Sequence, residues 1–490
     1  MRIIVIGSGF GGLAAAIRLR AQGHDVTIVE QRDQPGGRAY VYRQDGFTFD
    51  GGPTIITAPW LIDDVFTAAG RRTADYVSIV PIDPFYQIRF EDGTVFRYNG
   101  DREAIIRQIE ALNPADVAGY RRFVRDAERV FATGMGLIDK PFTSLLDMVK
   151  VLPDLIRLRA DRSVAGLTNR HIRDERLRQV FSFHPLLVGG NPFETTSIYT
   201  LIHPLEQKWG VWFAMGGTGK LVEGFVRLFG DLGGDLRLST RVEEITVDER
   251  TGRANGVRLA GGEVLPADAV VSNGDVAFTY KHLVAPRWRR TNTDAKIDRM
   301  SYSMSLMVIY FGTDVQYPDI AHHEIIMGPR YRGLLQEVFK TKTLADDFSL
   351  YLHRPTATDP SLAPPGGDAF YVLSPVPHLG GPTDWAAMAK PYRDRIMAYL
   401  EARYMPGLSK HIVTELAIDP RHFRDTLSSH LGSAFSVQPI LTQSAWFRPH
   451  NRSEDVPNLY FAGAGTHPGA GLPGVISSGK IVADLIGSAA

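Results

Sequence analysis

The sequence predicts an α/β fold in which a parallel sheet forms the centre of one domain of at least two. Three observations predict this fold. The N-terminal end alternates strand, glycine turn, helix and strand, as a βαβ unit does. The C-terminal end carries a second glycine-rich stretch, "FAGAGTHPGAGLPGV", with a helix expected from about Val475. The length of 490 residues exceeds what one simple core supports.

The composition is that of an ordinary folded protein and excludes several classes of function. Hydrophobic residues make up 44% of the chain and charged residues 22%. The 54 basic and 54 acidic residues balance, so the basic footprint that nucleic-acid binding requires is missing. The chain has no cysteine, which excludes disulfides, thiolate metal sites, a cysteine nucleophile and a thioether-linked cofactor.

The sequence predicts a cytoplasmic protein, or one that attaches to a membrane surface without spanning it. The chain opens with "MRIIVIGSG", which leaves no room for the charged head and apolar core of a signal peptide. No run of the roughly 18 apolar residues that cross a bilayer is found.

The N-terminal unit begins with a strand, a glycine turn and a helix. Ile3–Ile6 is apolar, as a buried parallel strand is, and Leu13–Gln22 is rich in alanine and leucine, as helices are. Between them stand Gly7, Gly9 and Gly12 in the GxGxxG spacing. The first glycine allows a tight turn, the second lets a pyrophosphate approach the backbone, and the third lets the helix pack closely on the strand. The phosphates would then face the positive end of the helix.

Glu30 completes a Rossmann-type dinucleotide-binding unit. A second strand is predicted at Val26–Val29, and Glu30 stands at its end. An acid roughly 20 residues past the glycines binds the hydroxyl pair of a ribose and disfavours the 2′-phosphate of NADP. The cofactor of this unit is therefore FAD or NAD.

Two further motifs resemble those of the flavoprotein amine oxidase and phytoene desaturase superfamily. One is "EQRDQPGGR", in which Arg38 follows a glycine pair and could neutralise a pyrophosphate. The other is "LYFAGAGT", residues 459–466. The resemblance implies FAD as the cofactor, bound by both ends of the chain, with Val242 contacting adenine through its backbone. The predicted cofactor-binding residues are Gly7, Gly9, Gly12, Glu30, Arg38, Gly52, Val242, Gly465, Gly474 and Val475.

The same resemblance implies how the chain is divided. A discontinuous FAD-binding domain is expected from residues 1–75, 215–285 and 425–490. Two insertions, 76–214 and 286–424, are expected to form an α+β substrate-binding domain and a helical, membrane-facing region.

Longer stretches narrow the resemblance to bacterial phytoene desaturases, the carotenoid desaturases that form lycopene. These stretches are Ser182–Gly224, Ser433–Arg452 and His467–Val475, and the similarity runs essentially end to end. It implies desaturation of phytoene, or a similar acyclic carotenoid, to lycopene or to a less desaturated product such as neurosporene. Each double bond would follow from hydride transfer to flavin N5 and proton loss from the neighbouring carbon. Either oxygen or a quinone would then reoxidise the flavin.

Asp147 is the candidate acid-base residue. It lies in an apolar stretch, where burial would raise the pKa of a carboxyl group. Related desaturases often have Arg-Asp at this point, whereas this chain has Leu146-Asp147. His184, His203 and His467 are alternative proton carriers, although a lone histidine is more often structural.

No metal site is predicted. His322 and His323 are adjacent, which is poor spacing for two ligands of one metal on a regular element.

A membrane surface, at the inner face of the cell membrane, is the expected source of such a substrate. Transfer from a bilayer into water costs about 0.8 kcal/mol of free energy per CH₂, so it would cost on the order of 30 kcal/mol for a hydrocarbon of ~40 carbons. This cost exceeds the roughly 20 kcal/mol at which binding free energies saturate. The stretch 145–162 has apolar residues at helical spacing among basic ones and could lie in a membrane interface, with a kink at Pro153. A helix that faces the protein core is an equal alternative.

Two other interpretations stay open. Another FAD oxidase of this fold would act on a different carotenoid or on an amine. Rab escort proteins and GDP-dissociation inhibitors share the fold and bind prenylated partners without flavin chemistry. The retained glycines and Glu30 argue against this last class.

Overall fold

A five-stranded parallel sheet brings together both ends and the middle of the chain. The computed structural model describes residues 1–136, 138–142 and 144–489. The strand order is β19-β13-β1-β2-β9, and all neighbouring strands run parallel, which confirms the predicted α/β class. The strands are β1 (Arg2–Ile6), β2 (Asp25–Val29), β9 (Asp235–Arg237), β13 (Ala269–Ser272) and β19 (Leu459–Phe461). All five fall within the three segments predicted for the FAD-binding domain, whose boundaries stay a prediction.

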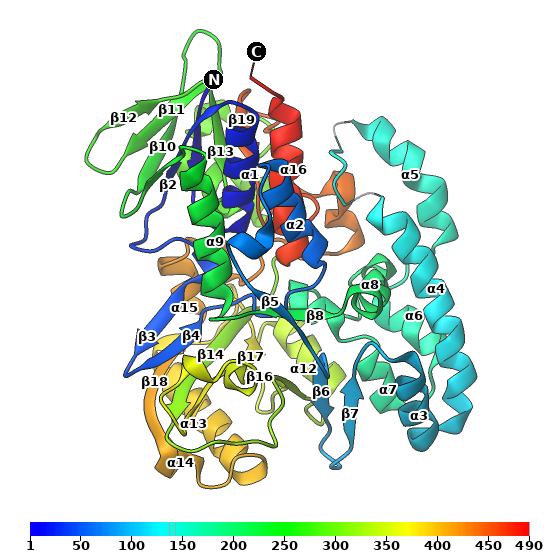
Figure 1. Ribbon diagram of the computed structural model, residues 1–490. Helices are drawn as coiled ribbons and strands as arrows, with labels where there is room; N and C mark the ends of the chain where they lie inside the picture. The colour runs from blue at the N-terminus through cyan, green and yellow to red at the C-terminus, as the bar shows by residue number, and fades with distance from the viewer. Residues whose placement is uncertain (137, 143, 490) are drawn as a thin grey trace.

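Helices pack over one face of this sheet (Figure 1). They are α1 (Phe10–Ala21), α9 (Thr218–Asp231) and α16 (Leu472–Ile486), each of which follows a glycine, and α2 (Pro59–Ala68), which packs against α1 and α16. α1 and α16 cross closely, because a Cβ at Gly479 would lie 2.7 Å from the Ala15 nitrogen. The helices α1 and α16 each begin three residues earlier than predicted, since a glycine N-cap sets the first residue of each.

A small antiparallel sheet is formed by the residues that lie between β9 and β13 along the chain. Its strands are β10 (Val242–Val247), β11 (Ala254–Leu259) and β12 (Val264–Pro266), in that order. The first of them packs with α10 (Val276–Phe278) over the face of the parallel sheet opposite to α1. This arrangement carries Val242 to the end of the parallel sheet where Glu30 lies.

A seven-stranded sheet of order β18-β14-β17-β16-β15-β6-β7 forms the lower part of the molecule in Figure 1. The strands are β6 (Tyr86–Arg89), β7 (Val95–Tyr98), β14 (Ser305–Thr313), β15 (His323–Ile326), β16 (Leu350–His353), β17 (Asp368–Val376) and β18 (Ile412–Ile418). Side chains alternate along β14: Met307 and Ile309 pack with α13 (Trp385–Arg403), while Leu306 and Val308 line an internal cavity. Further helices here are α12 (Tyr331–Gln336), α14 (Leu408–His411) and α15 (Pro420–Asp425), whereas Ile297 of α11 (Asp294–Asp298) packs in the core beneath the small antiparallel sheet.

A group of helices lies beside both sheets, at the right of Figure 1. It comprises α3 (Arg102–Leu112), α4 (Val117–Met135), α5 (Leu145–Arg157), α6 (Val164–His171), α7 (Glu175–Val180) and α8 (Ile202–Trp209). Two further short strand pairs are β3 (Val41–Gln44) with β4 (Phe47–Asp50), which packs against β17, and β5 (Ile79–Ile82) with β8 (Val211–Ala214). None of the described helices is both long and apolar enough to cross a bilayer.

Candidate active site

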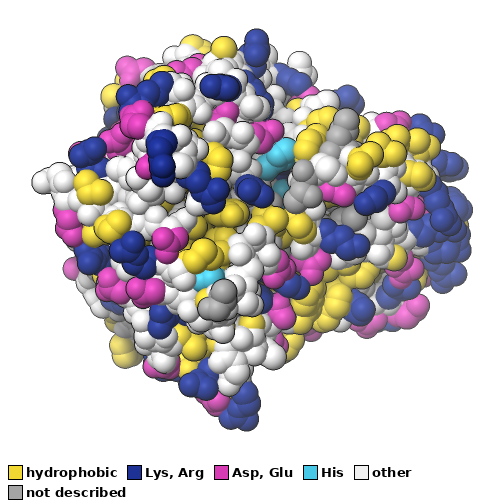
Figure 2. Space-filling view, turned by 90° about the horizontal axis from the view of Figure 1, so that it is seen from above, with side chains coloured by type: hydrophobic (Ala, Val, Ile, Leu, Met, Phe, Trp, Pro, Cys, Tyr) yellow, Lys and Arg dark blue, Asp and Glu magenta, His cyan; other side chains and the backbone are white. Residues whose placement is uncertain are grey.

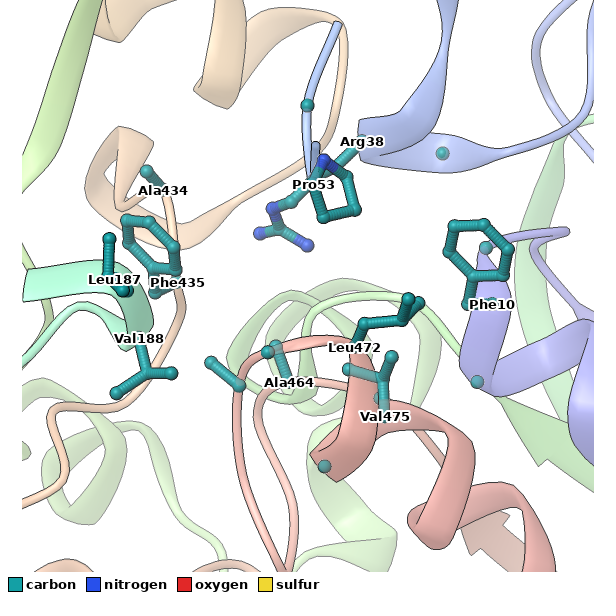
Figure 3. A pocket seen from close by; sticks show the side chains of 18 of the residues that line it. Phe10, Arg38, Pro53, Leu187, Val188, Ala434, Phe435, Ala464, Leu472 and Val475 are labelled. Carbon is teal, nitrogen blue, oxygen red and sulfur yellow. The ribbon is translucent and has the colours of Figure 1, made fainter. Parts of the chain in front are cut away.

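One cavity of about 600 Å³ runs from the N-terminal glycine turn into the space between the seven-stranded sheet and the helices (Figure 3). Its two ends differ in chemistry. Backbone and charged groups line the end beside the parallel sheet, and apolar side chains line most of the other end. The cavity therefore joins a polar compartment to an apolar one.

The glycine turn has the geometry that its sequence predicts. Gly7 has φ +92°, a left-handed conformation that disfavours other residues. A Cβ at Gly12 would lie 2.3 Å from the Gly7 carbonyl oxygen, so this glycine allows the close contact between α1 and β1. Gly9 lines the cavity at the N-terminus of α1, with Asn273 beside it. The positive end of α1 and its free N–H groups thus face the cavity.

Glu30 is buried at the end of β2 and lines the same compartment. One carboxylate oxygen accepts hydrogen bonds from the backbone N–H and the hydroxyl of Ser8, at 2.9 and 2.7 Å. The other accepts from the backbone N–H of Arg32 at 3.0 Å. These bonds hold the carboxylate in a fixed position beside the glycine turn, where a ribose is predicted to bind.

Arg38 extends its guanidinium group into the cavity (Figure 3). Its Nη2 donates to the Ser429 hydroxyl at 2.8 Å, and its buried Nε has no partner among the described residues. Burial lowers the pKa of Arg38, and the nearby Asp275 only partly opposes this effect. A buried cation with a free donor is costly unless an anion binds there, so the residues present fit the diphosphate of a dinucleotide such as FAD.

The C-terminal glycine-rich stretch faces these groups from the opposite wall. Gly463, Ala464, Gly474 and Val475 line the cavity, and α16 begins beside them. Gly465 does not line it: a Cβ there would lie 2.8 Å from both Ser436 Oγ and Val276 Cγ1, so this glycine allows tight packing.

The other predicted cofactor residues also have definite positions. Gly52 and Val242 line the cavity, whereas Gly12 lies behind it, in the contact between α1 and β1. The structure thus brings most of the predicted residues together, and their contacts with the cofactor stay a prediction.

Apolar side chains line most of the second compartment. It is lined from the helices and from the seven-stranded sheet, and includes Phe142, Met148, Leu155, Leu187, Leu205, Leu306, Val308 and Phe435. Hydroxyl groups occur at one wall, where Thr54 Oγ1 lies 2.5 Å from the Tyr371 hydroxyl and 3.1 Å from that of Tyr351. Such a lining suits a long apolar molecule that offers few hydrogen-bonding groups.

Glu206 is a buried carboxylate that lines this compartment and that the sequence analysis missed. It accepts a hydrogen bond from the Tyr86 hydroxyl at 2.6 Å and lies 3.2 Å from His184 Nε2. Burial, together with Glu206, raises the pKa of Tyr86 well above its usual value. The signal in the sequence was its spacing from His203, three residues earlier on α8, which places both on one helix face.

The other candidate proton carriers occupy different places. Asp147 lies outside the cavity lining, at the N-terminus of α5, where its carboxylate accepts from the Ser144 backbone N–H at 3.0 Å and pairs with Lys150 at 3.7 Å. It forms a capping box with Ser144, and its catalytic role stays a prediction. His467 lines the cavity. His203 is buried beside the Tyr98 hydroxyl, and burial lowers its pKa well below the usual value.

The helix α5 has two apolar faces. Met148 and Leu155 line the cavity. On the outer face Leu146, Val149, Leu152 and Ile156 are 68%, 57%, 48% and 64% exposed. Leu441 and Phe447 add exposed apolar surface from segments beside the helix. Apolar side chains also gather at this side of the molecule in Figure 2.

Comparisons with known proteins agree with this architecture. A family model described as "Flavin containing amine oxidoreductase" matches residues 10–487. A phytoene desaturase (lycopene-forming) of Pseudescherichia vulneris is 55% identical over 487 residues, which cover 99% of each chain. A phytoene desaturase (neurosporene-forming) of Rhodobacter capsulatus is 46% identical, over 99% of this chain and 94% of its own. A solved putrescine oxidase superposes with a TM-score of 0.65 at 14% identity, with 99% of each chain covered, and shares the fold.

Proposed function

Because the chain belongs to the flavin-containing amine oxidoreductases and, within them, to the phytoene desaturases, we propose that it desaturates phytoene to lycopene, or to a less desaturated product such as neurosporene. The observation that carries the proposal is the single cavity that joins a dinucleotide-type cradle to a hydrocarbon compartment. An amine substrate would instead require polar groups placed in the second compartment to bind its nitrogen.

Each part of the chain has a defined task in this reaction. Glu30 would hold a ribose of FAD, Arg38 and the N-terminus of α1 its diphosphate, and Val475 with the start of α16 its ring end. FAD, when bound, supplies the acceptor for the hydride that leaves one carbon of the substrate. The apolar walls align the polyene and exclude water. The proton on the neighbouring carbon then needs an acceptor that reaches the apolar compartment.

We assign Glu206 as that acceptor ahead of Asp147, because Glu206 lines the cavity and Asp147 does not. Glu206→Gln keeps the size of the side chain and its bond to Tyr86 but removes the base. We expect turnover to fall by roughly 100-fold with FAD content unchanged. Asp147→Asn is the matched comparison, and we expect turnover within about twofold of wild type. Turnover would be measured as carotene formed per bound FAD. The opposite order of effects would restore Asp147 as the acid-base residue.

We further propose that the outer face of α5 binds a lipid surface, so that substrate passes from the bilayer directly into the cavity. The same helix presents exposed apolar side chains outward and Met148 and Leu155 inward. Lys150, Arg157 and Arg159 are exposed around it and can contact lipid phosphates. The acceptor of the electrons would be oxygen or a quinone.

The test is a reconstitution of purified protein, FAD and liposomes that contain phytoene. We expect new visible absorption bands with resolved fine structure in the extracted lipid, whose positions count the double bonds. Parallel reactions without oxygen, with and without added quinone, identify the acceptor. Unchanged phytoene with fully bound FAD would refute the substrate assignment, and peroxide release on a polyamine would point to an amine substrate.

A further inference from the structure

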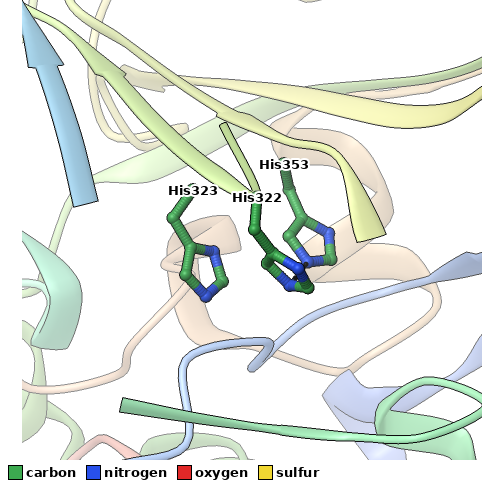
Figure 4. A group of neighbouring side chains, drawn as sticks. All are labelled: His322, His323 and His353. Carbon is green, nitrogen blue, oxygen red and sulfur yellow. Dashed lines mark hydrogen bonds between the residues drawn. The ribbon is translucent and has the colours of Figure 1, made fainter. Parts of the chain in front are cut away.

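Three histidines meet in the interior where strands β15 and β16 pair (Figure 4). His323 and His353 are direct partners across the two strands, and His322 precedes β15. All three side chains are buried. One ring nitrogen from each lies within 4.8 Å of the others. The spacing along the chain shows only the unfavourable adjacent pair, whereas strand pairing adds the third histidine.

Hydrogen bonds orient two of the rings in the way that metal-binding histidines are usually oriented. Nδ1 of His322 lies 2.6 Å from the Thr358 hydroxyl, and Nδ1 of His323 lies 2.7 Å from the Tyr351 hydroxyl. With the protons on these Nδ1 atoms, the Nε2 lone pairs are free to bind a metal. Nε2 of His323 is buried and has no partner among the described residues.

The third ring completes the set. Nε2 of His353 lies 3.2 Å from Nε2 of His322. Two nitrogens bound to one tetrahedral zinc ion lie about 3.4 Å apart. This pair already has nearly the required spacing, and a ring nitrogen of His323 belongs to a set of three whose members all lie within 4.8 Å of one another.

Burial and the neighbouring charges affect how the three imidazole rings could bind a cation. Burial disfavours the charged form of each ring: it lowers the pKa of His322 to about 3 and the pKa values of His323 and His353 well below their usual range. The neighbouring Arg354 is paired with the buried Asp368 at 3.0 Å, which offsets its repulsion of a cation. Neutral imidazole suits zinc and similar transition metals.

We propose that His322, His323 and His353 bind one divalent transition-metal ion of the zinc type through their Nε2 atoms, with a water molecule as fourth ligand. The ion would cross-link β15 and β16 next to Tyr351. The Tyr351 hydroxyl contacts His323, and the Tyr351 side chain lines the cavity. The ion would therefore fix one wall of the apolar compartment, away from the glycine cradle.

The test uses full-length, tag-free holoenzyme produced in zinc-supplemented medium and dialysed against a chelator. We expect about one zinc ion per chain by elemental analysis. X-ray absorption at the zinc edge should show imidazole nitrogens at about 2.0–2.1 Å. His353→Gln should lower the zinc content at least tenfold. His378→Gln, which removes another buried histidine, should leave it unchanged.

Two results would overturn the proposal. One is wild-type protein that holds less than a tenth of an ion per chain under these conditions. The other is zinc whose absorption spectrum lacks a set of three imidazoles, or whose content is the same in the His353→Gln variant. Because the wild-type measurements stand alone, the proposal remains testable even where a variant fails to fold.

Discussion

Arg38→Met is expected to weaken FAD binding by about 100-fold without destabilising the FAD-free protein. The guanidinium projects into the cavity with an unpartnered buried Nε, and burial lowers its pKa. Losing its charge-assisted bonds to a diphosphate would cost about 3 kcal/mol, and each 1.4 kcal/mol is a factor of ten. In the FAD-free protein the change removes a charge that burial destabilises and that Asp275 offsets only in part, so the melting temperature should stay the same or rise. Flavin fluorescence titration and thermal unfolding of the apoprotein measure the two effects.

Arg43→Met provides the matched control. Arg43 is exposed and pairs with Glu223 at 3.6 Å on the protein surface, so FAD affinity should change by less than about twofold. If Arg38→Met lowered the melting temperature of the apoprotein as much as it lowered FAD affinity, its role would be structural rather than one of binding the cofactor.

Changing Leu146, Val149, Leu152 and Ile156 together to glutamate is expected to reduce liposome binding by about 1000-fold. Each exposed side chain that enters the lipid interface contributes about 1 kcal/mol, so the four contribute about 4 kcal/mol. The added negative charges would also oppose attraction to anionic lipids. Co-sedimentation with vesicles measures binding. Desaturation of liposomal phytoene should fall in parallel, while FAD content and activity on detergent-solubilised phytoene are retained.

The control replaces exposed apolar residues elsewhere, Val264 and Val413, with glutamate. These side chains are 47% and 50% exposed and lie on β12 and β18, away from α5, so vesicle binding should not change. Equal loss of binding in the control and the α5 variant, or normal binding by the α5 variant, would exclude this face as the docking surface.

Much of the polar compartment could be predicted from the sequence because its geometry is local. Gly7, Gly9, Gly12 and Glu30 act within one βαβ unit, where a turn, a helix N-terminus and a strand end follow each other along the chain. Resemblance to a known family also predicted that the motif "LYFAGAGT" binds the same FAD. Gly463 and Ala464 of this motif line the same cavity as Arg38, and their contacts with FAD stay a prediction.

The surroundings of Gly465, Asp147 and Glu206 could not be predicted from the sequence, because they depend on where helices begin and on which distant segments pack together. Gly465 packs against Val276 and Ser436 rather than lining the cavity. Asp147 caps a helix, which an apolar sequence around it does not indicate. Glu206 meets Tyr86 from a strand 120 residues away, and only the packed structure turns it toward the cavity.

The sequence by itself determined the family, the cofactor and the Rossmann-type unit, since these rest on short motifs and on end-to-end similarity. Only the tertiary structure decided which face of α5 is exposed, that Glu206 rather than Asp147 lines the cavity, and that His353 joins His322 and His323. The physical reason is the same in all three cases. Helix and strand periodicity place side chains on faces, but the partner of each face is set by packing between segments far apart in the chain.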